Sequence, residues 1–179
     1  MEISDDTLIN SIRGGDNDSF EVIVERYKIQ IYNLMYRYSG STEDAADMAQ
    51  DVFCRAYERL GQYRKQKSFF AWLYTLALNY ARDWARKTSR REHTIATFAR
   101  ESLTNETKTP ERLLETDQET RGLVAALETL GEDRREMMLL RYRHEHSIKE
   151  LAEIFEISES AVKMRLKRAL DELGQKLRN

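Results

Sequence analysis

Residues 146–168 read HSIKELAEIFEISESAVKMRLKR, and this stretch predicts two short helices joined by a tight turn. Ser147 can cap the first helix, because its hydroxyl can accept a hydrogen bond from a backbone amide of the first turn. Ala152 is small enough to let the second helix approach closely. The apolar stripe of the first helix consists of Ile148, Leu151 and Phe155. The pattern is typical of a helix-turn-helix.

The second of these helices is predicted to follow a turn at Glu156 and Ile157, with Ser158 as its cap. On a helical wheel its inward face consists of Val162, Leu166, Ala169, Leu170 and Leu173. Its outward face consists of Ser160, Met164, Lys167 and Asp171, flanked by Lys163 and Arg168. Lys and Arg can donate to guanine and Met can touch a thymine methyl group, so this face is a candidate base reader. The alternative is a charged surface that serves only solubility.

The N-terminal half of the chain carries three further helical patterns. Apolar residues recur at three- and four-residue spacing over residues 19–38. A second helix is predicted from Thr42, as its N-cap, to about Leu60. A third is predicted over residues 68–87, apolar in its first half and basic at its end.

Periodicity fades between residues 91 and 112, where Thr, Ser, Asn and Glu and the only proline predict an interdomain linker. It returns at Leu123, and no strand-like alternation is visible. We therefore expect an all-α fold of two small helical domains joined by a linker, the C-terminal one containing the helix-turn-helix. The expected boundaries are 1–91 for the first domain, 92–114 for the linker and 115–179 for the second.

The charge of the 179-residue chain is close to balanced, at −2, but it is unevenly distributed. Residues 1–60 hold six basic and twelve acidic side chains, whereas residues 64–91 hold eight basic side chains and one acidic. Residues 159–178 hold six basic and three acidic side chains. Two basic blocks in an otherwise acidic chain predict two separate contacts with a polyanion such as nucleic acid.

Several classes of function are disfavoured by the sequence. The longest uncharged apolar run, around residues 72–81, is far shorter than the ~20 residues of a membrane span. The acidic N-terminus lacks the layout of a signal peptide, so a cytoplasmic location is expected. The sequence shows no Ser/His/Asp set, phosphate-binding glycine loop or metal-ligand cluster. We expect no enzymatic activity, cofactor, metal site or small-molecule substrate.

Acidic residues line one side of the helix predicted at residues 42–60. They are Asp44, Asp47, Asp51 and Glu58, with Gln50 and Arg55 nearby. Three interpretations stay open: a solvated face, a protein-binding surface or a carboxylate metal site. The metal site is disfavoured, because di-metal sites in helix bundles need Glu-x-x-His repeats that are absent from the sequence.

Residues 63–91 combine aromatic and basic side chains. The aromatic residues are too numerous for all of them to lie in the core of a small domain. An aromatic pocket beside cations suits single-stranded nucleic acid, because an unstacked base gains roughly 1–3 kcal/mol by stacking on a ring. One basic block therefore suits single strands, and the helix-turn-helix suits duplex DNA.

Three segments resemble those of bacterial RNA polymerase sigma factors of the two-domain extracytoplasmic-function group. They are DMAQDVF at residues 47–53 followed by RAY at 55–57, SFFAWLY at 68–74, and LGEDRR at 130–135 ahead of the helix-turn-helix. The resemblance spans nearly the whole chain in the same order. It implies binding to core RNA polymerase, through its β′ clamp helices and β flap, and recognition of promoter DNA. It also implies an anti-sigma factor as an inhibitory partner.

The resemblance assigns roles to three sets of residues. Polymerase binding is expected of Asp44, Asp47, Gln50, Asp51, Phe53 and Arg55. Recognition of the melted −10 element is expected of Tyr63, Arg64, Lys65, Lys67, Phe69, Asn79, Arg82 and Arg86. Recognition of the −35 duplex is expected of Ser160, Lys163, Met164, Arg165, Lys167 and Arg168.

The sequence departs from the family's usual pattern at three places. Gly131 stands where a proline is usual, and Glu156 replaces a turn glycine at a position that can require positive φ. The loop over residues 63–67 is more basic than usual, which leaves the −10 base preference open. Two other functions remain as alternatives: a dimeric helix-turn-helix regulator acting without replacing a sigma factor, and an enzyme or interaction protein that uses the helix-turn-helix as a protein contact.

Overall fold

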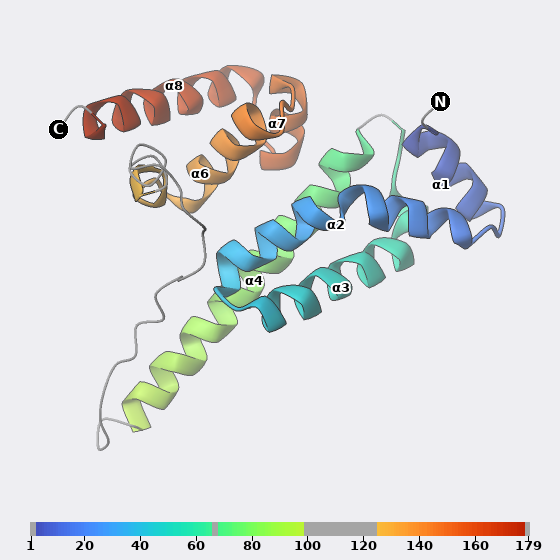
Figure 1. Ribbon diagram of the computed structural model, residues 1–179, viewed down its shortest axis with the longest axis horizontal. Helices are drawn as coiled ribbons and strands as arrows, with labels where there is room; N and C mark the ends of the chain where they lie inside the picture. Colours follow the sequence, from blue (N-terminus) through green and yellow to red (C-terminus); the bar gives the residue numbers. More distant parts are fainter. Residues whose placement is uncertain (1–2, 66–67, 99–124, 178–179) are drawn as a thin grey trace, which may run out of the picture. The chain divides into compact units, whose positions relative to one another are not determined.

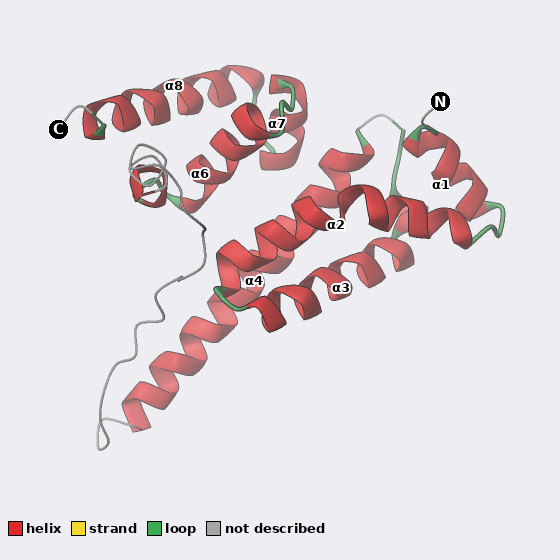
Figure 2. Cartoon of the chain, in the orientation of Figure 1, coloured by secondary structure: helices red, strands yellow, loops and turns green. Residues whose placement is uncertain are grey.

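The computed structural model describes residues 3–65, 68–98 and 125–177. All regular elements in these ranges are helical, and Figure 2 shows helices and connecting loops without a strand in the described parts. The predicted all-α fold is thus confirmed. The chain divides into two compact units, Met1–Pro110 and Glu111–Asn179. This division lies within the segment predicted as a linker, most of which is outside the described residues.

Up to residue 98, the described part of the N-terminal unit contains four α-helices and a short 3-10 helix (Figure 1). They are α1 (Asp5–Arg13), α2 (Asp18–Ser39), α3 (Thr42–Glu58), η1 (Leu60–Gln62) and α4 (Phe69–Phe98). Helix α2 is central, since α1, α3 and α4 all pack against it. Its side chains Ile23, Ile31 and Leu34 are fully buried, as is Leu73 of α4.

The sequence allowed three or four helices ahead of the linker, and helix α1 is the fourth, at a position where none had been placed. Ser4 caps it by accepting a hydrogen bond from the Thr7 amide, and two acidic residues occupy its first turn. Arg13, at its end, donates to the backbone oxygens of Leu60 and Tyr63 at 2.9 and 2.6 Å. The helix therefore holds the start of the loop between α3 and α4 in place.

The boundaries of α3 and α4 differ from those predicted. The N-cap of α3 is Ser41, whose hydroxyl accepts from the Asp44 amide, so the prediction of Thr42 as the cap was wrong by one residue. Gly40 makes the preceding turn possible, because it adopts a left-handed backbone with φ 66°. Helix α4 continues to Phe98, well beyond the predicted end.

The C-terminal unit contains the helix-turn-helix. After a helical segment at 125–128 come α6 (Glu132–Met138), the π-helical turn η2 (Leu139–Arg143), α7 (Ile148–Phe155) and α8 (Glu159–Lys176). Helix α7 packs on α8, and α6 packs on α8 as well. Arg134 of α6 donates to Glu172 of α8 at 2.7 Å. Gly131 is the N-cap of α6 and provides no side-chain cap.

The predicted caps and turn of the helix-turn-helix are confirmed. Ser147 forms a reciprocal capping box with Glu150, and Ser158 accepts from the Ala161 amide. Glu156 adopts the expected left-handed conformation, with φ 54°. The inward face of α8 is buried except at Leu170, which is 45% exposed, so its assignment to the core was wrong. No helix in the described ranges is long and apolar enough to cross a membrane.

Candidate protein and nucleic-acid interfaces

The acidic residues of α3 lie on its solvent-exposed side. Asp44, Asp47 and Asp51 are exposed, and so are Gln50 and Arg55. These carboxylates are spread along one face of a single helix and do not converge on a point. Among the residues described, no group of three or more His, Cys, Asp or Glu side chains could hold a metal ion. The arrangement fits a charged protein-binding surface or a solvated face.

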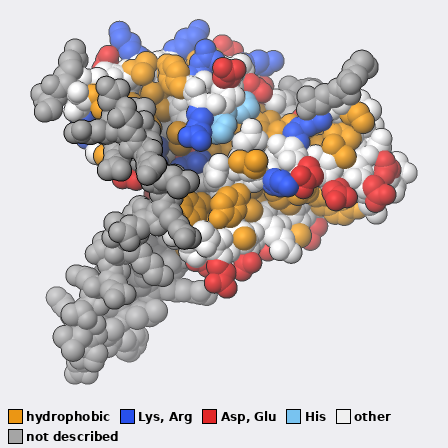
Figure 3. Space-filling model, in the orientation of Figure 1, with side chains coloured by type: hydrophobic (Ala, Val, Ile, Leu, Met, Phe, Trp, Pro, Cys, Tyr) orange, Lys and Arg blue, Asp and Glu red, His pale blue; other side chains and the backbone are white. Residues whose placement is uncertain are grey.

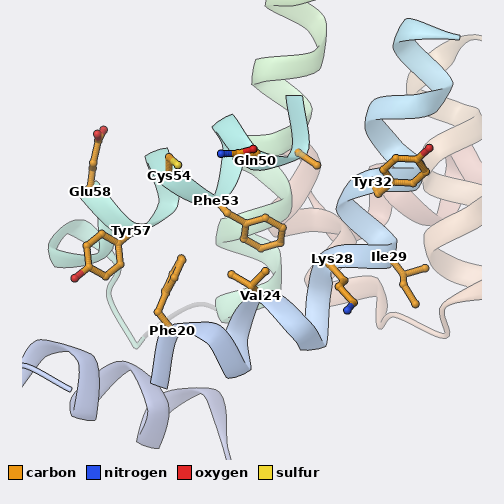
Figure 4. A pocket seen from close by; sticks show the side chains of 11 residues that line it. Phe20, Val24, Lys28, Ile29, Tyr32, Gln50, Phe53, Cys54, Tyr57 and Glu58 are labelled. Carbon is orange, nitrogen blue, oxygen red and sulfur yellow. The ribbon is translucent and has the colours of Figure 1, made fainter. Parts of the chain in front are cut away.

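Phe53 is the one remaining residue predicted for polymerase binding, and unlike the other five it is buried. Its side chain is only 7% exposed, and it forms part of an apolar groove between α2 and α3 with a volume of about 890 Å³ (Figure 4). The other main lining residues are Phe20, Val24, Ile29, Tyr32 and Tyr57. Phe53 is therefore placed to contribute apolar surface inside this groove, beside the acidic face.

The α2–α3 groove was missed in the sequence because its residues share helices with core residues. Ile29 is 66% exposed and Tyr57 is 41% exposed, although both have the apolar or aromatic character of the neighbouring core. The ring of Phe20 meets that of Tyr57 edge to face, with centroids 5.0 Å apart. An exposed isoleucine beside an aromatic pair is surface that a partner can cover.

A three-residue cluster joins the acidic face of α3 to α4. The Tyr80 hydroxyl donates to Asp51 Oδ2 at 2.8 Å. The Arg55 guanidinium lies over the Tyr80 ring, 4.6 Å from its centroid. Burial, and then the hydrogen bond to Asp51, raise the pKa of Tyr80 to about 12. Tyr80 was not among the predicted site residues.

Two residues predicted to contact the −10 element are buried. Tyr63 is 4% exposed and Phe69 is 2% exposed, and their rings meet edge to face with centroids 5.3 Å apart. Burial, followed by the charge of Asp6, raises the pKa of Tyr63 to about 12. Because both rings are buried, they are not accessible for direct contact with a base. They pack the start of α4 instead, with the half-buried Trp72 beside both.

The polar −10 candidates are accessible where the structure describes them. Asn79 and Arg86 are exposed and Arg82 is partly exposed along α4. Arg82 Nη1 lies 3.5 Å from Asn79 Oδ1, and Arg86 pairs with Asp83 one turn earlier. Arg64 and Lys65 are exposed in the preceding loop, whereas Lys67 lies outside the described residues.

Five of the six predicted −35 residues lie on the outward face of α8, and Arg165 does not. Ser160, Lys163, Lys167 and Arg168 are exposed, Met164 is 55% exposed, and Arg165 is partly buried. Figure 3 shows Lys and Arg side chains gathered over the C-terminal unit. Val162 and Leu166 are buried on the opposite side of the helix. The cationic side chains of this face therefore point away from the core of the C-terminal unit.

Comparisons with known proteins agree with this arrangement. Residues 23–91 match the family described as Sigma-70 region 2, and residues 120–173 match that described as Sigma-70, region 4. The chain is 31% identical to the ECF RNA polymerase sigma factor SigW of Bacillus subtilis, with 100% of both chains covered. It is 28% identical to the ECF RNA polymerase sigma-E factor of Escherichia coli, covering 98% of this chain and 95% of that protein.

Two solved structures have a similar fold. CnrH, solved in complex with the cytosolic domain of CnrY, matches with a TM-score of 0.67 and 24% identity, covering 95% of this chain and 94% of that chain. RpoE of Bartonella quintana, solved with the anti-sigma factor NepR, matches with a TM-score of 0.62 and 19% identity, covering 89% and 96%. The full-length match to SigW and the two regions in order show that the chain belongs to the ECF group of RNA polymerase sigma factors.

Proposed function

We propose that the chain binds core RNA polymerase through the acidic face of α3 and directs it to promoters, without catalysing a reaction itself. The observation that carries this proposal is the exposure of Asp44, Asp47 and Asp51 in a row on one helix of the region 2 match. Exposed carboxylates steer and orient a cationic partner surface. The β′ clamp helices are the proposed partner of this face, in the cytoplasm where transcription takes place.

Helix α4 is the proposed reader of the melted −10 element. Asn79, Arg82 and Arg86 are accessible along it, and the exposed loop cations Arg64 and Lys65 precede it. Amide and guanidinium groups suit the edges and phosphates of unpaired nucleotides. The buried rings of Tyr63 and Phe69 have a supporting role in this proposal, because they anchor the loop and the start of α4.

Helix α8 is the proposed reader of the −35 duplex. Lys163 and Lys167 can donate to base edges or phosphates, while Met164 presents an apolar side chain of the kind that contacts thymine methyl groups. The C-terminal unit is also the proposed contact for the β flap. An ordinary dimeric regulator would use the same helix, but the region 2 match and the acidic face of α3 favour the sigma factor.

An anti-sigma factor is a further proposed partner. Of the structures with a similar fold, RpoE was solved with the anti-sigma factor NepR and CnrH with the cytosolic domain of CnrY. The α2–α3 groove is apolar and borders the acidic face, since Gln50 and Phe53 contribute to its lining. A protein that covered this groove would block access to the proposed polymerase surface.

Run-off transcription from genomic promoters, with bacterial core polymerase and with or without this chain, tests the proposal. We expect promoter-specific transcripts that require the chain and that fall more than about tenfold with Asp51→Arg, because like charges across an interface cost several kcal/mol. Glu21→Arg is the matched control, since Glu21 is exposed on α2 and lies outside both the acidic face of α3 and the groove lining. Specific DNA binding without chain-dependent transcripts would favour the dimeric regulator.

A further inference from the structure

Tyr80 lies between the two proposed binding surfaces of the N-terminal unit. It belongs to α4, where its neighbours Asn79 and Arg82 are proposed to read promoter DNA. Its side chain, however, contacts α3 through Asp51 and Arg55. Both of those residues are exposed members of the face proposed to bind polymerase. One side chain of the DNA-reading helix thus touches two residues of the polymerase face.

The geometry of these contacts restrains both α3 side chains. Asp51 and Arg55 are one helical turn apart, so they lie on the same side of α3. The Tyr80 hydroxyl holds the Asp51 carboxylate at 2.8 Å, and its ring lies under the Arg55 guanidinium. A free arginine or carboxylate side chain loses rotamer freedom when it is captured in an interface. A contact that orders these side chains beforehand reduces that loss.

The Tyr80 hydroxyl keeps its proton at neutral pH. Burial and the neighbouring Asp51 carboxylate raise the pKa of Tyr80 to about 12, so the group donates to Asp51 throughout neutral pH. The ring is only partly exposed. Tyr80 is therefore a fixed donor and a fixed platform for the two charged residues.

We propose that Tyr80 is a positioning residue for polymerase binding, which orients Asp51 and Arg55 from the DNA-reading helix α4. This inference rests on the proposed function of α3. It extends the polymerase surface to a residue on another helix, outside the acidic stripe. Helix α4 would then serve both proposed surfaces, because it carries the −10 residues and, through Tyr80, orients the polymerase residues.

The first test is the affinity of the full chain for core polymerase, measured by titration with a fluorophore at the N-terminus. Tyr80→Phe removes the hydroxyl and keeps the ring, and we expect about threefold to tenfold weaker binding, the affinity lost when a side chain that was ordered beforehand has to be ordered on binding. Tyr80→Leu removes the ring as well and should weaken binding further. In an Asp51→Ala background, Tyr80→Phe should change the affinity less than twofold, because its acceptor is gone.

A second measurement separates positioning from general stability. Transcription with Tyr80→Phe should return to the wild-type level at saturating polymerase, and the thermal midpoint should stay unchanged within about 2 °C, as expected for a partly exposed hydroxyl. Tyr36→Phe is the matched control. Tyr36 stacks on Tyr32 from the same helix, α2, and is not part of the groove lining, so its hydroxyl should be dispensable.

Three results would overturn the inference. They are an unchanged or tighter polymerase affinity for Tyr80→Phe, an equal loss in the Asp51→Ala background, and a transcription defect that persists at saturating polymerase. The last result would place the role of Tyr80 on the DNA side. Failure of the proposed function looks different, because the wild-type chain itself would then fail to bind polymerase.

Discussion

Glu156 holds the turn between α7 and α8 in a left-handed backbone conformation, with φ 54°. Such a backbone costs an L-residue roughly 1 kcal/mol or more, whereas glycine adopts it freely. Glycine also makes the unfolded chain more flexible, which offsets part of the gain. We therefore expect Glu156→Gly to stabilise α7 and α8 by about 0.5–1 kcal/mol. Hydrogen exchange of their backbone amides measures this change.

The same substitution within a helix is the control for Glu156→Gly. Glu153 lies in α7, where glycine costs roughly 1 kcal/mol relative to a good helix former. Glu153→Gly should therefore speed amide exchange while Glu156→Gly slows it. Equal effects of both variants would show that the turn at Glu156 is not strained.

Helix α7 has eight residues, so its N-terminal cap is a large part of its stability. The Ser147 hydroxyl accepts from the Glu150 amide at 3.1 Å, and the Glu150 carboxylate accepts from the Ser147 amide at 2.9 Å. Ser147→Ala should destabilise the C-terminal unit by about 0.5–2 kcal/mol. Urea denaturation measures the free energy of unfolding, and hydrogen exchange of the α7 backbone amides shows whether the loss lies in this helix. Ser160→Ala, an exposed change on α8, should stay within about 0.5 kcal/mol of wild type.

Helices that begin with a capping residue followed by a clear apolar period could be predicted from the sequence. Ser147 and Ser158 each precede a clear apolar period, so their caps were predicted at the correct residues. At α3 two adjacent hydroxyl residues compete, and the structure selects Ser41, which has the extended backbone of a cap. Helix α1 is short and buries only Leu8, Ile9 and Ile12, too few residues to show a clear period.

The roles of aromatic residues could not be read from the sequence in the same way. An aromatic ring beside basic residues has the same local pattern in a base-stacking pocket and in a core. The structure resolves this for Tyr63 and Phe69, which pack against each other and against Trp72. The part of α4 beyond the predicted end at residue 87 was also unpredictable, because no apolar residue occurs between Lys87 and Ile95 to continue the period.

At the scale of the whole molecule, the acidic face proposed to bind polymerase and the basic face proposed to read the −35 duplex are on different units. The acidic face of α3 belongs to the N-terminal unit, and the basic face of α8 belongs to the C-terminal unit. A net charge of −2 hides this separation, which the local balances revealed. Two faces of opposite sign allow one chain to bind a protein and a polyanion at the same time without the two competing.

This separation predicts that binding defects divide by unit. Lys167→Ala should weaken binding of the full chain to duplex DNA containing the −35 element by about fivefold or more, since a base contact contributes roughly 1–3 kcal/mol. It should leave the affinity for core polymerase within about twofold, because Lys167 lies on the outward face of α8 that is proposed to read DNA, and not on the polymerase face of α3. Asp51→Arg should show the reverse pattern in the same two titrations. If either variant lost both affinities, α3 and α8 would have to act as one coupled surface, and the division of roles would be wrong.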